Sequence, residues 1–467
     1  MPPPQLSPAI QSISNVRLHS NNPKTTPSTY GLTFSDQQTL QSLLPTTSSN
    51  NSPLALPALT HPHIHLDKAY IHNSPSYTNH HPKTGSFQEA LTLTTQAKSI
   101  FTLPDLHARG EWLLSESLLN GVTALRAFIE IDHTVHHKCL HTALTLKSQW
   151  RTHCHIQVVA FAQDPLFSGP WAAENRHEIQ SALQHHPDNI DVIGSTPYVE
   201  SDRTAAEQNI RWAITTALEW DKHVDFHLDY NLDPGKGALV WFVLDCLREY
   251  GWVERSRKRV MLGHCTRFTL FGRDEWDRLA REVEGLPVSF VGLPSSDLYM
   301  AAPVGSSCCS EEERAGDRDR DRVRGTLRVP ELVKRYGLDV CLGVNNVGNA
   351  FTPWGSVDPL ALACLGVGVY QAGTAQDAEL LYECVSTRAR AAIGLEGDEG
   401  LWVKEGRADL VLFFDVDETG CGVVRPRGSV AEVVWDPPAR VARAVVVGGR
   451  LVRGRAALWD DEAFRFV

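Results

Sequence analysis

Histidine is the residue type whose positions in this sequence most clearly indicate chemistry. The chain has 20 histidines, of which the last is His264, so any later metal ligand would have to be a carboxylate, an amide or a cysteine. His63 and His65 are two positions apart, which places both side chains on one side of an extended strand. Two neutral imidazoles that face one point are good ligands for zinc or iron. Neighbours such as His80-His81 make a chance pair the alternative interpretation.

Two further histidines each end a short apolar run that is typical of a strand. His227 ends the run 224–227, and His264 ends the run 260–264. In a barrel of alternating strands and helices, the residues that do chemistry lie at the carboxyl ends of the strands. Their placement therefore favours a functional site over two buried structural histidines.

Alternating strand-like and helix-like segments extend from Leu56 to about Arg390. Short apolar runs recur at intervals of roughly 30 residues, with amphipathic stretches such as 203–222 and 235–250 between them. This pattern predicts an α/β protein with a (β/α)8 TIM barrel, and a doubly wound parallel sheet is the runner-up. An additional helix is expected at 86–100. The eight predicted strands end near His65, Glu130, Gln163, Pro197, Asp229, His264, Leu293 and Asn345.

The segments on both sides of the predicted barrel have a strand-like pattern. We expect residues 1–57 and 394–467 to build one small accessory β-sandwich beside a barrel domain of residues 58–393. The stretch 306–328 is dense in aspartate, glutamate and arginine, which predicts a solvated loop. The predicted strands of the accessory domain are 13–18, 408–414, 430–434 and 441–452.

Composition limits the classes of partner. The net charge is −11 at pH 7, with 55 acidic and 44 basic residues, which argues against a general nucleic-acid-binding or anionic-membrane-binding protein. No run of about 18 apolar residues occurs, and the first residues do not form a secretory signal. We therefore expect a soluble cytoplasmic protein that acts on a small-molecule substrate, and a homo-oligomer is compatible with the sequence.

The order of these motifs resembles that of the amidohydrolase superfamily, in particular its cytosine deaminase-like branch. The resemblance rests on the segment His63-Ile64-His65-Leu66-Asp67, on His227 and His264, and on the turn 343–354. The later segment 405–411 is similar to the accessory β-domain of that superfamily. The resemblance covers nearly the whole chain and implies a metal-dependent barrel enzyme with one divalent ion, zinc or iron.

The resemblance also implies roles for individual residues. His63, His65 and His227 would be the metal ligands, and His264 would polarise the substrate or stabilise developing charge. A second group would contact the substrate: Gln163 by hydrogen bonding to its ring, Lys68 as in relatives that hydrolyse triazine-type amines, and Phe351 or Trp354 as an apolar wall. A surface lysine is the alternative interpretation of Lys68.

Two positions depart from the pattern of the family. The family has an aspartate at the end of strand eight, which binds the metal and takes a proton from water, and the best match here is Asn345. Deaminase relatives have a glutamate three residues after the strand-five histidine, and Tyr230 occupies that position. An amide cannot accept the proton, and a tyrosine with an ordinary pKa near 10 is a poor two-way shuttle near neutral pH. We therefore expect weaker metal binding and a different route for the proton.

The sequence thus predicts a metal-dependent amidohydrolase-type enzyme. Its reaction would be hydrolysis of a non-peptide C–N bond, by deamination or by amide or amidine hydrolysis, in a small cyclic nitrogen-containing substrate. Because of Asn345 and Tyr230, a non-hydrolytic barrel enzyme and a ligand-binding pseudoenzyme remain the alternatives.

Overall fold

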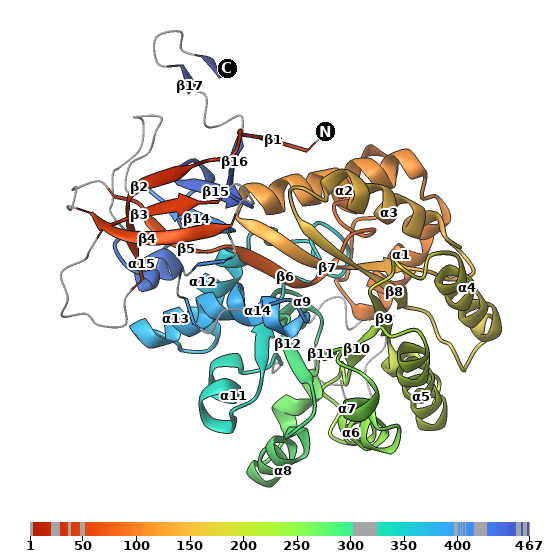
Figure 1. Ribbon diagram of the computed structural model, residues 1–467. Coiled ribbons are helices and arrows are strands. Elements are labelled where there is room, and N and C mark those ends of the chain that lie inside the picture. Colours follow the sequence, from red (N-terminus) through yellow and green to blue (C-terminus); the bar gives the residue numbers. More distant parts are fainter. Residues whose placement is uncertain are drawn as a thin grey trace.

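The chain forms a barrel of parallel strands surrounded by helices, with a separate sheet beside it (Figure 1). The computed structural model describes residues 3–19, 29–35, 39–46, 52–301, 325–396, 400–401, 403, 405–406, 408–414, 427–453, 459–460 and 465–466. Among these residues, no helix is both long enough and apolar enough to cross a membrane.

The barrel has eight parallel strands that are neighbours in chain order, which confirms the predicted (β/α)8 fold. Each strand ends within three residues of the position that the apolar runs predict. Nearly all of their residues are buried, as expected where helices cover the outside of a parallel sheet. The strands are β6 (Leu59–His65), β7 (Val122–Glu130), β8 (His155–Ala162), β9 (Val192–Ser195), β10 (His223–Leu228), β11 (Val260–His264), β12 (Val288–Gly292) and β13 (Val340–Leu342).

Asn345 closes the barrel between its last and first strands. Its backbone N–H donates to the carbonyl of His63 (3.1 Å), and its carbonyl accepts from the N–H of His65 (2.9 Å). The bridge that forms between Asn345 and Ile64 is parallel, like the rest of the barrel. Asn345 is therefore fixed beside His63 and His65, two of the three histidines of β6.

Local sequence explains why the connecting helices begin where they do. The Ser86 hydroxyl accepts from the Glu89 N–H at the start of α1, and Asp202 accepts from the Ala205 N–H at the start of α5. The α-helices of the barrel region are α1 (Phe87–Ser99), α2 (Leu103–Leu119), α3 (Lys138–Trp150), α4 (Ala172–His185), α5 (Arg203–Glu219), α6 (Val240–Glu249), α7 (Trp252–Arg255), α8 (Arg273–Val283), α9 (Pro294–Met300), α11 (Val329–Tyr336), α12 (Pro359–Val369), α13 (Ala375–Cys384) and α14 (Thr387–Ala392). Short 3₁₀ turns are η1 (Ile71–Asn73), η2 (Pro75–Tyr77), η3 (Pro197–Val199), η4 (Thr266–Leu270) and η5 (Arg440–Ala442).

Both ends of the chain contribute to the second sheet. Its eight strands have the order β1-β16-β15-β14-β5-β2-β3-β4, so C-terminal strands lie between N-terminal ones. Because strands from both ends of the chain share this sheet, we propose that residues 1–57 and 394–467 form one accessory domain beside a barrel domain of residues 58–393. The strands are β1 (Gln5–Leu6), β2 (Ser12–Leu18), β3 (Thr29–Phe34), β4 (Leu40–Thr46), β5 (Leu54–Pro57), β14 (Leu410–Phe413), β15 (Arg443–Val447) and β16 (Arg450–Arg453). A separate antiparallel pair consists of β17 (Trp459–Asp460) and β18 (Arg465–Phe466).

One predicted strand of the accessory region is wrong. Residues 430–434 lie in the helix α15 (Val430–Trp435), because Ser429 and Glu432 form a capping box at its start. Its buried residues Val430, Val433 and Val434 follow helical spacing, which an apolar β-branched run conceals. Most of the predicted charged loop 306–328 lies outside the described residues, which resume at residue 325.

Candidate active site

Three buried histidines converge at the carboxyl end of the barrel. The Nε2 atom of His227 lies 3.2 Å from Nε2 of His63 and 3.1 Å from Nε2 of His65. Two nitrogens that each lie about 2.0–2.1 Å from one zinc ion, at a tetrahedral angle, are about 3.3 Å apart. Burial lowers the pKa of all three imidazoles well below its usual range, which keeps them in the neutral form that binds metal. The three side chains therefore fit a single divalent ion.

Backbone irregularity in β6 selects which histidines face the barrel interior. The pairing with β7 shifts between His61 and Ile64, and the His61 ring lies 3.2 Å from the hydroxyl of Ser117 on α2. Gly263 then makes room for the ring of His63, because a Cβ atom there would lie 3.3 Å from His63 Cε1. The strand thus sends His61 outward, although it belongs to the same alternating run of histidines.

The side chain of Asn345 lies beside these imidazoles. Its amide lies close enough to His63 and His65 to oppose in part the lowering of their pKa values. Its Oδ1 atom is buried and has no hydrogen-bond partner among the described residues. The backbone of Asn345 has a φ of +67°, a strained conformation that asparagine tolerates better than most residues. An unpaired amide oxygen at this place fits a fourth, neutral metal ligand.

His264 is held next to the three histidines by a carboxylate. Its Nδ1 atom lies 2.8 Å from Oδ1 of Asp297, and ring nitrogens of His63, His227 and His264 lie within 4.8 Å of one another. Asp297 also accepts from the N–H of Leu293 and the hydroxyl of Thr326. Because a carboxylate accepts the Nδ1–H, the tautomer that fits leaves Nε2 of His264 as a proton acceptor.

Tyr230 stacks on His264 and does not act as a carboxylate would. The two ring centroids are 3.9 Å apart with an interplanar angle of 28°, and the phenol oxygen lies 3.4 Å from the carbonyl of Ser296. Burial raises the pKa of Tyr230 well above its usual value, so its hydroxyl stays protonated near neutral pH. Phe87 and Tyr198 complete the aromatic surroundings of this ring.

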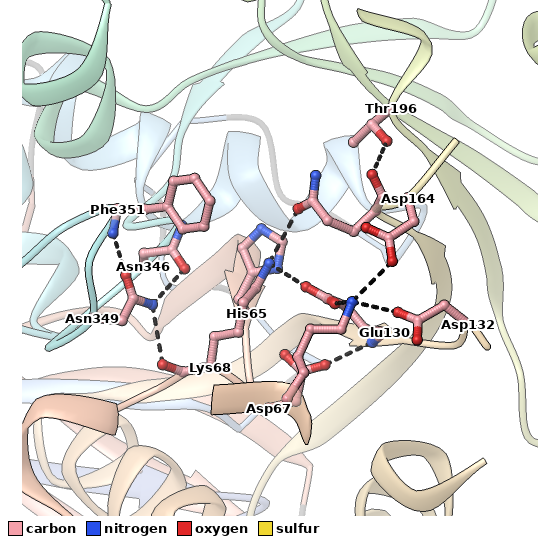
Figure 2. A network of polar contacts seen from close by, with 12 residues as sticks. His65, Asp67, Lys68, Glu130, Asp132, Asp164, Thr196, Asn346, Asn349 and Phe351 are labelled. Carbon is pink, nitrogen blue, oxygen red and sulfur yellow. Dashed lines mark hydrogen bonds and ion pairs between the residues drawn. The ribbon is translucent and has the colours of Figure 1, made fainter. Parts of the chain in front are cut away.

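Lys68 belongs to a buried network of charges at the barrel mouth (Figure 2). Its Nζ atom lies 2.6 Å from Oε1 of Glu130 and donates to Oε1 of Gln163 at 3.2 Å. The other oxygen of Glu130 lies 2.6 Å from Lys98, which in turn pairs with Asp132 and Asp164. Burial opposes ionisation of Glu130, but Lys68 and Lys98 lower its pKa to about 2. Lys68 is thus a buried, fixed cation and not a surface lysine.

The predicted aromatic wall residues have different surroundings. Lys68 Nζ lies 5.5 Å from the ring centre of Phe351 and 5.7 Å from that of Phe161, so Phe351 is next to the polar network. The side chain of Trp354, by contrast, lies at the surface, where the residue is 44% exposed. The site roles of all these residues remain predictions.

Several residues of the site had no sequence prediction. Glu130 stands at a predicted strand end, so its position gave a signal that could have been used. Asp297 lies within α9 and Lys98 within α1, where no spacing pattern distinguishes them from other helix residues. Asp225 on β10 also lies near a histidine, with Oδ1 3.9 Å from His63 Nδ1. Its Oδ2 pairs with Arg126 (3.0 Å), and burial, opposed by that arginine, raises the pKa of Asp225 to about 7.

The fold is similar to those of several solved enzymes, although no family model matches the chain. It superposes on 5-methylcytosine deaminase from Klebsiella pneumoniae with a TM-score of 0.75 and 20% identity, covering 95% of this chain and 97% of that one. For N-isopropylammelide isopropylaminohydrolase from Burkholderia multivorans the TM-score is 0.70, with 20% identity and coverage of 94% and 97%. For guanine deaminase from C. acetobutylicum the TM-score is 0.61, with 12% identity and coverage of 94% and 99%.

Curated relatives match in sequence over a shorter range. N-isopropylammelide isopropyl amidohydrolase of Pseudomonas sp. strain ADP is 20% identical over 297 residues, which are 63% of this chain and 63% of that protein. The uncharacterized protein YahJ of Escherichia coli K12 is 21% identical over 322 residues, 68% of this chain and 60% of YahJ. The chain therefore spans less than two thirds of the length of either relative.

Proposed function

We propose that this chain, whose fold is that of the amidohydrolase-superfamily deaminases, is a metal-dependent hydrolase of a non-peptide C–N bond in a small cyclic nitrogen-containing substrate. The observation that carries the proposal is the convergence of three neutral Nε2 atoms, with distances of 3.1 and 3.2 Å, at the carboxyl end of the barrel. The relatives named above, which act on cytosine, guanine and isopropylammelide derivatives, support the class of substrate.

The residues present fit one divalent ion, zinc or iron. His63, His65 and His227 would hold it, with the amide oxygen of Asn345 as a neutral fourth ligand. Such an ion supplies Lewis acidity, which makes a water more acidic and polarises the bond that is attacked.

His264 is the group that we propose as proton acceptor, because Asn345 cannot take that role. Its Nε2 atom would accept a proton from the attacking water, while Asp297 stabilises the positive charge that forms on the ring. The same nitrogen would then return the proton to the leaving nitrogen of the substrate. Tyr230 would orient the His264 ring by stacking and would not transfer the proton itself.

Lys68 and Gln163 would orient the substrate ring. The Lys68 ammonium has three donors, of which one is directed to Glu130 and one to Gln163, so one remains for a substrate acceptor. Phe351 would form an apolar wall near this acceptor, and Trp354 would contribute only from the exposed rim of the site.

Metal content and amine release test this proposal directly. Elemental analysis of the purified protein should find about one equivalent of zinc or iron, and a screen of cyclic amides, amidines and aminopyrimidines should detect release of ammonia or an amine. His227→Ala should lose the metal and the activity, whereas His107→Ala, a partly exposed histidine on α2, should keep both. A well-folded protein that binds neither metal would contradict the proposal.

The proton acceptor can be tested separately. His264→Asn should keep the metal and lower kcat by about 10²–10⁴-fold, the usual contribution of one general acid–base group. Asp297→Asn should lower kcat in the same direction. Unchanged kcat in His264→Asn would exclude this residue as the base.

A further inference from the structure

Asp225 is a fully buried carboxylate on β10 that lies next to His63. It precedes His227 by two residues on β10, so both side chains point to the same side of the strand. Its Oδ2 atom is bound by Arg126, whereas its Oδ1 atom has no hydrogen-bond partner among the described residues. Oδ1 lies 3.9 Å from Nδ1 of His63, which is likewise buried and without a partner among those residues.

A buried donor and a buried acceptor that both lack hydrogen-bond partners lower the stability of the folded protein. A histidine that gives Nε2 to a metal carries its hydrogen on Nδ1 and almost always donates it to a carboxylate, a carbonyl or a water. Within the described part of the chain, His63 is the one of the three candidate ligands with a carboxylate oxygen within 4.0 Å of a ring nitrogen. A shift of less than 1 Å would bring this pair to hydrogen-bond distance.

We infer that Asp225 is a positioning residue that accepts the Nδ1–H of His63 and thereby directs Nε2 of His63 toward the metal. The inference rests on the proposed metal-dependent function. It also explains how the chain tolerates Asn345. The neutral amide brings no negative charge to the ion, and Asp225 would supply a carboxylate behind the ligand His63 instead. Arg126 keeps the carboxylate in place by pairing with its other oxygen and by donating to Gln157 and to the carbonyl of Ile393.

Zinc affinity measures this role without any substrate. Asp225→Asn should weaken zinc binding to the reloaded apoprotein by about 10–100-fold, the usual effect of removing such a partner, in competition with a chromophoric chelator. Because the single change leaves the Arg126 guanidinium buried without its counter-charge, the double variant Arg126→Met/Asp225→Asn is measured beside it. The matched control is Arg443→Met/Asp358→Asn, which removes another largely buried ion pair outside the barrel interior and should leave zinc affinity within twofold.

A crystal structure of the zinc-loaded parent protein gives a second test of the inference that needs no variant. The distance between His63 Nδ1 and Asp225 Oδ1 should fall from 3.9 Å to about 3 Å. A distance above 3.5 Å, or zinc affinity of the double variant within twofold of the parent, would overturn the inference. A protein that binds zinc in this Asp225-dependent way but turns over no substrate would contradict the proposed function alone.

Discussion

At the scale of single residues, the main question is how the proposed metal site would work with Asn345, which follows the eighth barrel strand, β13. Asn345 lies beside His63 and His65, where we propose the metal site, and its buried amide oxygen has no hydrogen-bond partner among the described residues. As ligands, three imidazoles and an amide would leave the full double charge of the proposed ion uncompensated. They would make water at the ion more acidic, at the expense of metal affinity.

Asn345→Asp should therefore tighten zinc binding, by about tenfold or more, because the new carboxylate compensates part of the charge. Chelator competition on the reloaded apoprotein checks this, with Asn346→Asp as the control for a charge added one residue away. Together with Tyr230→Glu, which places a second carboxylate beside His264, the change should confer deaminase-like turnover. Unchanged affinity in Asn345→Asp would place the asparagine outside the metal site.

His223 gives a pH-dependent contribution to stability at the other end of β10. Burial, with the nearby charges of Arg126 and Lys258, lowers its pKa from 6.5 to about 3. Between these values the unfolded chain binds a proton that the folded protein does not, so the free energy of unfolding falls as the pH decreases from about 6.5 toward 3.

His223→Asn should remove this dependence. From pH 4.5 to 6.5, the free energy of unfolding of the metal-free parent should rise more steeply than that of the variant, by about 1 kcal/mol per pH unit. Urea unfolding at several pH values measures the difference. Buried aspartates with raised pKa values act in the opposite direction, but they are common to both proteins. Parallel curves of unfolding free energy against pH would show that His223 is protonated in the folded state.

At the scale of elements, helix α1 anchors the barrel mouth through Lys98. This side chain is buried and faces Glu130, Asp132 and Asp164, and burial opposes its charge while these carboxylates raise its pKa well above the usual range. The same helix contributes Phe87 to the aromatic surroundings of Tyr230. An insertion between the first two barrel strands thereby supports the cation Lys68 and the ring that stacks on His264.

Lys98→Met should destabilise the protein by about 3–5 kcal/mol, because it leaves carboxylates buried without their partner. Lys147→Met removes a more exposed pair with Asp191 and should cost less than about 1 kcal/mol. Chemical unfolding compares the two variants. Equal effects would mean that the buried network adds nothing beyond a surface ion pair.

At the scale of the whole molecule, the accessory sheet is joined to the barrel by side chains of β15 and the turn before it. The side chain of Arg443 is 2% exposed, and its guanidinium pairs with Asp358 (2.7 Å) and donates to the carbonyl of Asn120. Asp358 also caps α12, so one carboxylate links the accessory sheet to a barrel helix.

Arg443→Met should lower the free energy of unfolding by about 3 kcal/mol and separate the unfolding of the accessory sheet from that of the barrel. The neighbouring Arg440→Met breaks an exposed pair with Glu116 and should change stability by less than about 1 kcal/mol. Scanning calorimetry resolves one transition from two. A single, unshifted transition in Arg443→Met would show that this contact does not couple the two parts.

The sequence by itself determined the barrel and the identity of its main candidate ligands. Strand ends follow from apolar runs at regular intervals, because a buried parallel strand must be apolar throughout and each helix needs a similar length of chain. His63, His65, His227 and His264 were predicted because they stand at those strand ends, and the structure brings them together.

Only the tertiary structure decided which atoms face one another. His61 and His63 are equivalent in sequence, and a shift in the pairing of β6 with β7 separates them. Asp297, Asp225 and Lys98 reach the site from a short helix, a strand interior and an inserted helix, and no local spacing encodes such long-range contacts. The strand predicted at 430–434 was wrong for the opposite reason, since a capping box, a local signal, outweighs the strand propensity of valine there. Periodicity therefore fixes elements, whereas the site depends on three-dimensional packing that brings distant polar atoms into a low-dielectric interior.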